Sequence, residues 1–187
     1  MKKIKANGKD YEIRNEGKEV TLNELSKIAF IFNGKEGDFT DKWLKVIEVL
    51  SCKELIEVIT LKQFTELVQS IQITNIKKKI KKTITVKGRD YSLNMDGKEI
   101  ALLAKDLRKI ESLISDKIPW GHKAFALIYK DVNLSDNEHY TDAHIKYKAD
   151  LFGDEVNADI AAPVIFSLSK LIIEHIQALS DAQSVAV

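Results

Sequence analysis

Residues 4–20 read IKANGKDYEIRNEGKEV and residues 84–100 read ITVKGRDYSLNMDGKEI, and the two stretches are versions of one sequence. They align at a constant offset of 80 residues over 17 positions without a gap, and seven of these positions are identical. Unrelated stretches of this length share about one identity, so the match predicts an internal duplication. The identical pairs are Ile4 and Ile84, Gly8 and Gly88, Asp10 and Asp90, Tyr11 and Tyr91, Gly17 and Gly97, Lys18 and Lys98, and Glu19 and Glu99.

Each copy begins with the pattern of a β-hairpin. In the first copy, apolar and polar residues alternate before and after the dipeptide Asn7-Gly8. Asn-Gly favours the type I′ turn, whose backbone twist matches the twist of the two strands that it joins. Lys87-Gly88 stands at the same place in the second copy, so we expect a hairpin there too.

Helical patterns follow each hairpin. Thr21 and Glu24 have the spacing of a capping box, which predicts that a helix begins next to Thr21. Apolar spacing of three and four residues predicts further helices at 39–50, 52–73, 102–114, 120–129 and 161–179. The apolar face of the first helix is formed by Leu22, Leu25, Ile28, Ala29 and Phe32.

We therefore predict an α+β fold made of two hairpin-plus-helices repeats, residues 1–76 and 77–187, packed about a pseudo-twofold axis. A single repeat is close to the lower size limit for an independent core, and pairing the two repeats would overcome this limit. The second repeat contains an additional polar segment at 131–159. The predicted core residues are Tyr11, Ile13, Leu22, Leu25 and Trp43, with Tyr91, Leu93, Leu102, Leu107 and Trp120 in the second repeat.

Composition excludes several classes of protein. The chain has 187 residues, of which 44% are hydrophobic and 30% charged, and 29 basic residues against 28 acidic ones leave a net charge of +1. This balance argues against disorder, and a single cysteine, Cys52, excludes a disulfide framework. No apolar run has the length of a membrane-spanning helix, and the first residues lack the apolar core of a signal peptide. We expect a cytoplasmic protein with no membrane association.

No catalytic pattern stands out along the chain. The glycine patterns of phosphate-binding loops and of the nucleophile elbow are missing from the sequence. His139 and His144 lie five residues apart, which does not place them on one helical face, so we expect no metal site. We therefore predict a protein that is not an enzyme and has no cofactor.

The segment 131–159 is the best candidate for a partner-binding surface. Long polar insertions in compact domains are often functional, and exposed aromatic side chains are good interface anchors. Ser135 and Glu138 form a capping box, which predicts a helix over 136–151. The simpler alternative is that this helix only covers an exposed edge of the second repeat. The predicted contact surface is centred on His139, Tyr140, His144 and Tyr147.

A basic run precedes the second hairpin and suggests an alternative function. Five lysines could neutralise several phosphates of a nucleic acid. Against this, the chain is nearly neutral and the run has no interleaved aromatic residues. Lysines beside an edge strand also protect it from pairing with other strands. The residues of this basic strip are Lys77, Lys78, Lys79, Lys81 and Lys82.

The start of each copy, a hairpin of the form I-x-x-x-G-[KR]-[DE]-Y-x-[IL] followed by a Leu-rich helix, resembles small phage proteins. It is similar to the starts of tail-assembly chaperones and related minor structural proteins, where a V-N-G-K-x-Y hairpin precedes a helical body. The resemblance covers 4–13 with 22–31, and 84–93 with 102–110. It implies a non-catalytic phage protein that binds a virion component or a host protein, and the repeat leaves a homo-oligomer open. It assigns no role to any single residue.

Overall fold

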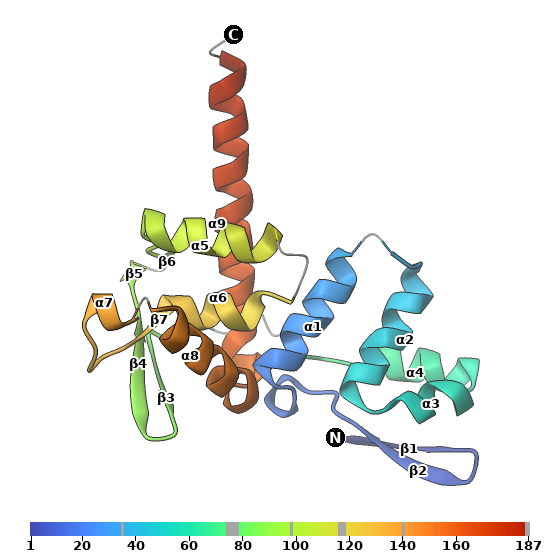
Figure 1. Ribbon diagram of the computed structural model, residues 1–187. Helices are drawn as coiled ribbons and strands as arrows, with labels where there is room; N and C mark the ends of the chain where they lie inside the picture. The colour runs from blue at the N-terminus through green and yellow to red at the C-terminus, as the bar shows by residue number, and fades with distance from the viewer. Residues whose placement is uncertain (35, 74–78, 98, 116–118, 140, 186–187) are drawn as a thin grey trace.

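The computed structural model describes residues 1–34, 36–73, 79–97, 99–115, 119–139 and 141–185. The fold is mixed α+β, with small antiparallel sheets and helices that form most of the body (Figure 1). One long helix, α9 (Ala158–Val185), runs through the C-terminal part and projects beyond it.

The two predicted hairpins have the same geometry. Strands β1 (Lys2–Ala6) and β2 (Lys9–Ile13) pair with Ile4 opposite Tyr11, and strands β3 (Thr83–Val86) and β4 (Arg89–Leu93) pair with Ile84 opposite Tyr91. Both turns have two residues with positive φ, 48° and 76° at Asn7-Gly8 and 49° and 76° at Lys87-Gly88. Positive φ at both central positions defines the type I′ turn, so both hairpin predictions are confirmed.

The chain also returns to the second strand of each hairpin at the same distance in sequence. In the second half, β7 (Tyr129–Asp131) pairs with β4, with Leu93 opposite Tyr129. In the first half, the Arg14 N–H donates to the Leu50 carbonyl over 3.1 Å and the Ser51 hydroxyl donates to the Glu12 carbonyl over 2.8 Å. The chain therefore follows the same path in both halves, but the returning segment is a strand in the second half and not in the first.

The two copies differ immediately after their hairpins. Residues Gly17–Glu19 form a short 3₁₀ helix, η1, whereas β5 (Met95–Asp96) and β6 (Glu99–Ile100) form a second small hairpin. Gly97 has a φ of 58° in its turn, a left-handed conformation that favours glycine. At position 17, glycine is required because there is no space for a Cβ atom. A Cβ atom on Gly17 would lie 2.3 Å from the Asp159 Oδ1 atom and 3.0 Å from the Ile73 carbonyl oxygen. The 17-residue match is therefore not one conformation throughout.

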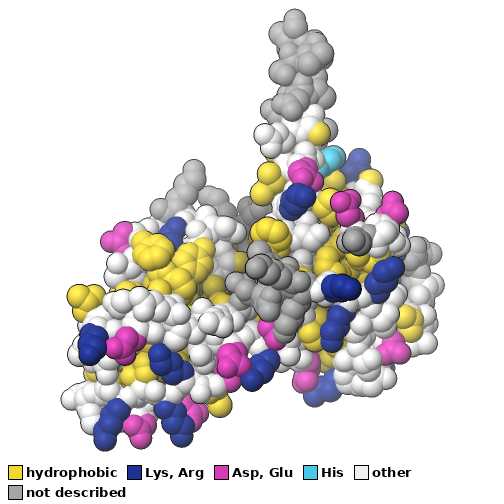
Figure 2. Space-filling view, turned by 180° about the vertical axis from the view of Figure 1, so that it is seen from behind, with side chains coloured by type: hydrophobic (Ala, Val, Ile, Leu, Met, Phe, Trp, Pro, Cys, Tyr) yellow, Lys and Arg dark blue, Asp and Glu magenta, His cyan; other side chains and the backbone are white. Residues whose placement is uncertain are grey.

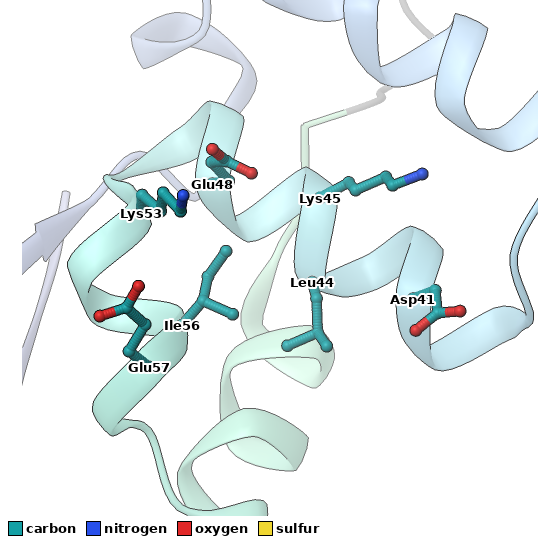
Figure 3. A pocket seen from close by; sticks show the side chains of 7 residues that line it. All are labelled: Asp41, Leu44, Lys45, Glu48, Lys53, Ile56 and Glu57. Atoms are coloured by element: carbon teal, nitrogen blue, oxygen red, sulfur yellow. The ribbon is translucent and has the colours of Figure 1, made fainter.

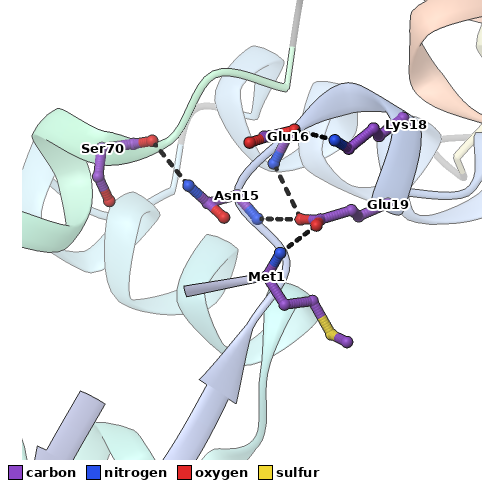
Figure 4. A network of polar contacts seen from close by, with 6 residues as sticks. All are labelled: Met1, Asn15, Glu16, Lys18, Glu19 and Ser70. Atoms are coloured by element: carbon purple, nitrogen blue, oxygen red, sulfur yellow. Dashed lines mark hydrogen bonds and ion pairs between the residues drawn. The ribbon is translucent and has the colours of Figure 1, made fainter. Parts of the chain in front are cut away.

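Polar contacts tie the start of the chain to η1 and to the end of α4 (Leu61–Ser70) (Figure 4). The Met1 ammonium pairs with the Glu19 carboxylate, which also accepts from the Asn15 backbone N–H over 3.2 Å. The Asn15 side chain donates to the Ser70 carbonyl over 3.4 Å. The Met1 ammonium group and the backbone N–H groups of Asn15 and Glu16 lower the pKa of Glu19. These contacts fix the base of the first hairpin on the helices.

The helices of the first half follow their capping residues. α1 (Leu22–Asn33) begins after Thr21, and the predicted capping box with Glu24 is confirmed. α2 (Phe39–Leu50) has the predicted bounds. The single helix predicted at 52–73 is wrong: the structure has α3 (Lys53–Val58) and then α4, because Thr60 caps a new helix through its contacts with Gln63.

The second half contains α5 (Ala104–Ser115), α6 (Gly121–Ile128), α7 (Asp136–His139) and α8 (Asp142–Glu155). Ser135 and Glu138 form the predicted capping box, but the single helix predicted at 136–151 is wrong. The Thr141 hydroxyl accepts the His144 N–H over 3.3 Å and starts α8 as a separate helix.

The aromatic part of the core lies where the second sheet meets α6 and α8. Phe152 contacts Tyr91 and Phe125 edge to face, at ring-centroid distances of 4.7 and 5.8 Å, and Phe125 stacks on Tyr129. The predicted core residues Tyr11, Ile13, Leu22, Leu25, Tyr91 and Leu93 are buried. The others, Trp43, Leu102, Leu107 and Trp120, are partly buried against this core.

Helix α1 joins the two halves. It packs on α2, as α5 packs on α6, but it also packs on α6 and α8 (Figure 1). At its start, the Leu22 N–H donates to the Val156 carbonyl over 2.6 Å and the Ala158 N–H donates to the Val20 carbonyl over 2.7 Å. A two-fold axis would also place α5 against α2, and no comparable contact is present within the described parts of these helices.

Candidate functional site

The insertion contains a buried lysine and a buried histidine in contact. Lys148 on α8 is fully buried, and its ammonium group donates to the Tyr129 carbonyl over 2.8 Å. It also lies 2.9 Å from Nδ1 of His139, the last residue of α7. The other ring nitrogen, Nε2, lies 2.8 Å from the Leu127 carbonyl oxygen. This arrangement assigns the imidazole the neutral form, with Nδ1 accepting and Nε2 donating.

Burial shifts the protonation of both groups. Removal from water lowers the pKa of Lys148 to about 7, although the nearby carboxylate of Asp131 opposes the shift. Burial, and secondly the positive charge of Lys148, lower the pKa of His139 to about 4. Because both side chains hydrogen-bond carbonyls at the end of α6, the cluster holds α7 and α8 against that helix.

The predicted contact surface is therefore only partly exposed. His139 is 1% exposed, so its predicted place at the surface is wrong: its ring is needed inside, between Lys148 and the end of α6. Tyr140 lies outside the described residues. On α8, Tyr147 is half exposed and His144 is half buried, with the two rings 6.3 Å apart. Among the described residues of the predicted surface, the exposed part is the Tyr147 side of α8.

The sequence did not reveal the burial of Lys148. Two further polar atoms of the second half are also buried. The Tyr91 hydroxyl and His144 Nε2 have no hydrogen-bond partner among the described residues. Burial raises the pKa of Tyr91, with a further contribution from Asp131, and burial lowers the pKa of His144. Neither Lys148 nor His139 lines any of the three described cavities.

Part of the basic strip precedes β3 as exposed chain. Lys79, Lys81 and Lys82 are exposed, and the predicted residues Lys77 and Lys78 lie outside the described residues. The Lys81 carbonyl accepts from the Tyr129 hydroxyl over 2.5 Å, which ties this segment to β7. The three described lysine side chains are available for an anionic partner.

Two hollows of the described surface lie along α2. One, of about 290 Å³, opens between α2 and α3 (Figure 3). It has acidic and basic side chains around Leu44 and Ile56. The other, the α1–α2 groove, has a volume of about 380 Å³. It is lined by Lys27, Phe30 and Ile31 of α1, by Lys45, Glu48 and Val49 of α2, and by Pro119.

Apolar side chains are exposed on the projecting helix. Phe166, Ile173 and Ile176 of α9 are 55%, 60% and 54% exposed. All side chains from Ile173 to Ala178 are exposed, so the helix leaves the body after the buried Ile172. Figure 2 shows hydrophobic side chains on this helix and a larger group over the N-terminal half. We call Phe166, Ile173 and Ile176 the α9 stripe.

Neither a metal cluster nor a membrane span is found in the described parts of the chain. No three His, Cys, Asp or Glu side chains there converge as metal ligands. No helix described by the structure is long and apolar enough to cross a bilayer. Cys52, expected within a helix, precedes α3 as its N-cap residue and is half buried.

No protein-family model, curated protein or solved structure matches this chain.

Proposed function

We propose that this chain is a non-catalytic protein-binding factor that acts in assembly, and that α9 carries its main contact. The observation that carries this proposal is the α9 stripe on a helix that projects into solvent. The projecting part of α9, residues 173–185, has 13 residues. An isolated helix of about this length is marginal in water, and most helical stability in proteins comes from packing an apolar face. Exposed apolar side chains on such a helix are typical of a surface that a partner covers.

The proposed setting is the assembly of a phage particle, with a virion component or a host protein as partner. The resemblance of both hairpin starts to tail-assembly chaperones and minor structural proteins supports this setting. Duplication of a unit, residues 1–76 and 77–187, is part of the proposal. It is supported by the common hairpin registers and by the corresponding return of each half to its second strand.

A capture experiment tests the function. The full chain is used as bait in an extract of its natural host, with wild type compared with Ile173→Asp/Ile176→Asp. We expect the double variant to lose the captured protein, because two charges desolvated at an apolar contact oppose binding. Ala178→Asp is the matched control, because Ala178 is exposed on the opposite side of the same helix. Equal capture by all three proteins would contradict the proposal.

The exposed side of α8 is a second location for the partner. Tyr147→Ala removes an aromatic side chain that is half exposed, so the melting temperature should be unchanged. Loss of captured protein would place part of the contact there. Full retention would limit α7 and α8 to the role of a cover for α6 and β4.

Nucleic-acid binding through Lys79, Lys81 and Lys82 is the alternative function, favoured by the exposure of these three lysines. Binding to generic duplex DNA is measured as a function of salt. Phosphate binding releases counterions and weakens steeply as salt rises. The absence of binding at about 50 mM salt would eliminate this alternative.

A further inference from the structure

The walls of the α1–α2 groove have the geometry of a helix-binding site. Lys27, Phe30 and Ile31 stand at positions i, i+3 and i+4 of α1, and Lys45, Glu48 and Val49 repeat this spacing on α2. Each helix thus presents one continuous face to the groove. Two such faces side by side form the groove into which a third amphipathic helix packs.

The projecting part of α9 has the dimensions of such a helix. From Ile173 to Val185 it has 13 residues, which corresponds to about 20 Å. α1 and α2 have 12 residues each, or about 18 Å. Ile173 and Ile176, at i and i+3, are exposed on it, and Phe30 in the groove is 38% exposed. The groove lining spans 27–31 of α1 and 45–49 of α2, so the exposed residues from Ile173 to Ala178 are enough to cover it and match its apolar character.

The charges of helix and groove are complementary. Lys27 and Lys45 are exposed on opposite walls of the groove and make no ion pair within the described part of the chain. Residues 173–185 contain the acidic Glu174 and Asp181 and neither lysine nor arginine. Glu174 contacts Lys170 in its own helix at 3.5 Å, but the pair is exposed and leaves the carboxylate accessible. The groove also contains Glu48, so its charged residues leave a net charge of +1, opposite in sign to the charge of residues 173–185.

This helix does not fill the groove of its own chain. Figure 1 shows α9 rising away from the body, and its side chains from Ile173 to Ala178 are exposed. From apolar matching and charge, we infer that the occupant of the α1–α2 groove is the projecting α9 helix of a second copy of this chain. This inference rests on the proposed function, since it names the partner of the same α9 stripe.

The contact is heterologous, because donor helix and acceptor groove are different surfaces. Each bound copy still has a free helix or a free groove, so copies add head to tail into a ring or a filament. A protein with a defective α9 helix, called donor-defective, still has an intact groove. A protein with a defective groove, called acceptor-defective, still has an intact helix, so the two proteins can make one contact with each other. Their mixture should stop at a dimer with one copy of each.

The test uses the full chain and measures mass in solution by sedimentation over a range of concentrations. Wild type should form species larger than a dimer. Ile173→Asp/Ile176→Asp, the donor-defective protein, should be monomeric alone. Lys27→Glu/Lys45→Glu changes only exposed groove residues, and its self-association should weaken by about tenfold or more. Lys62→Glu/Lys146→Glu, the charge-matched control, should behave as wild type.

The decisive sample is the mixture of donor-defective and acceptor-defective proteins, which should form a one-to-one dimer. A second acceptor variant, Phe30→Asp, should give the same dimer. If the groove variants assemble as wild type while the donor variant does not, the groove is not the acceptor and the inference is wrong. If wild type is monomeric at all concentrations, the inference is also wrong. The proposed function still stands after that result if the capture experiment recovers another protein through the α9 stripe.

Discussion

Replacement of Lys148 by Met tests the buried cluster at the end of α6. The Lys148 ammonium group is fully buried and hydrogen-bonds the Tyr129 carbonyl and His139 Nδ1. Met has a similar length and no charge, so it removes both contacts and the cost of burying the ion. At one pH, the change in the free energy of unfolding combines all these effects. Of the effects removed by the substitution, only the protonation of Lys148 changes between neutral and alkaline pH.

The magnitude follows from the shifted pKa. Burial lowers the pKa of Lys148 from 10.5 in the unfolded chain to about 7 in the folded protein. Between these values the unfolded chain binds more protons, so the free energy of unfolding rises with pH. From pH 7 to pH 9, this group should add about 2 kcal/mol to the stability of the wild type. For a chain of this size the gain corresponds to about 6 °C in melting temperature.

The assay compares the free energy of unfolding by urea in wild type and Lys148→Met at intervals from pH 7 to pH 9. The difference between the two proteins should change with pH by the amount given above, because other ionisable groups are common to both. Lys146→Met, at an exposed position of the same helix, is the control and should leave the slope as in wild type. A constant difference between wild type and Lys148→Met would refute the protonation argument.

Three further predictions concern stability. Gly17→Ala should cost about 1–3 kcal/mol, because its Cβ would lie 2.3 Å from Asp159 Oδ1, and Asp159→Ala in that background should recover part of the loss in a urea titration. Phe152→Ala should cost about 3–5 kcal/mol because the ring is fully buried, whereas Phe166→Ala, at 55% exposure, should change the free energy of unfolding by less than about 0.5 kcal/mol. Below pH 6.5, wild type should lose stability down to about pH 4, where folded His139 takes up its proton, and His139→Gln should reduce this loss in thermal melts.

Local signals predicted the hairpins and the start of α1 from the sequence. Asn7-Gly8 fixes a two-residue turn by backbone conformation alone, and Thr21 with Glu24 satisfies helix N–H groups within four residues. The breaks at Thr60 and Thr141 were missed, although both residues cap the following helix. The apolar spacing continues through the break at Thr60, so periodicity joined α3 and α4 into one helix. At Thr141, the capping box at Ser135 indicated where a helix begins but not where it ends.

The features that depend on distant contacts could not be predicted. Tyr129 belongs to a strand because β4 lies beside it, and the end of α6 gives no sign of that partner. Lys148 resembles any solvated helix lysine in the sequence, and its burial follows from the positions of Tyr129 and His139. Gly17 and Gly97 are identical in the alignment but have different roles, because only Gly17 lies against Asp159.

The most direct measurement of the central claim is site-specific photo-cross-linking in the natural host. A photoreactive amino acid replaces Ile176 in the α9 stripe or, as the control, Ala178 on the opposite face of the helix. We expect a discrete protein adduct, whether with another protein or with a second copy, from position 176 and a much weaker one from position 178. Adducts of equal strength from both positions, adducts removed by nuclease, or no adduct from position 176 would contradict it.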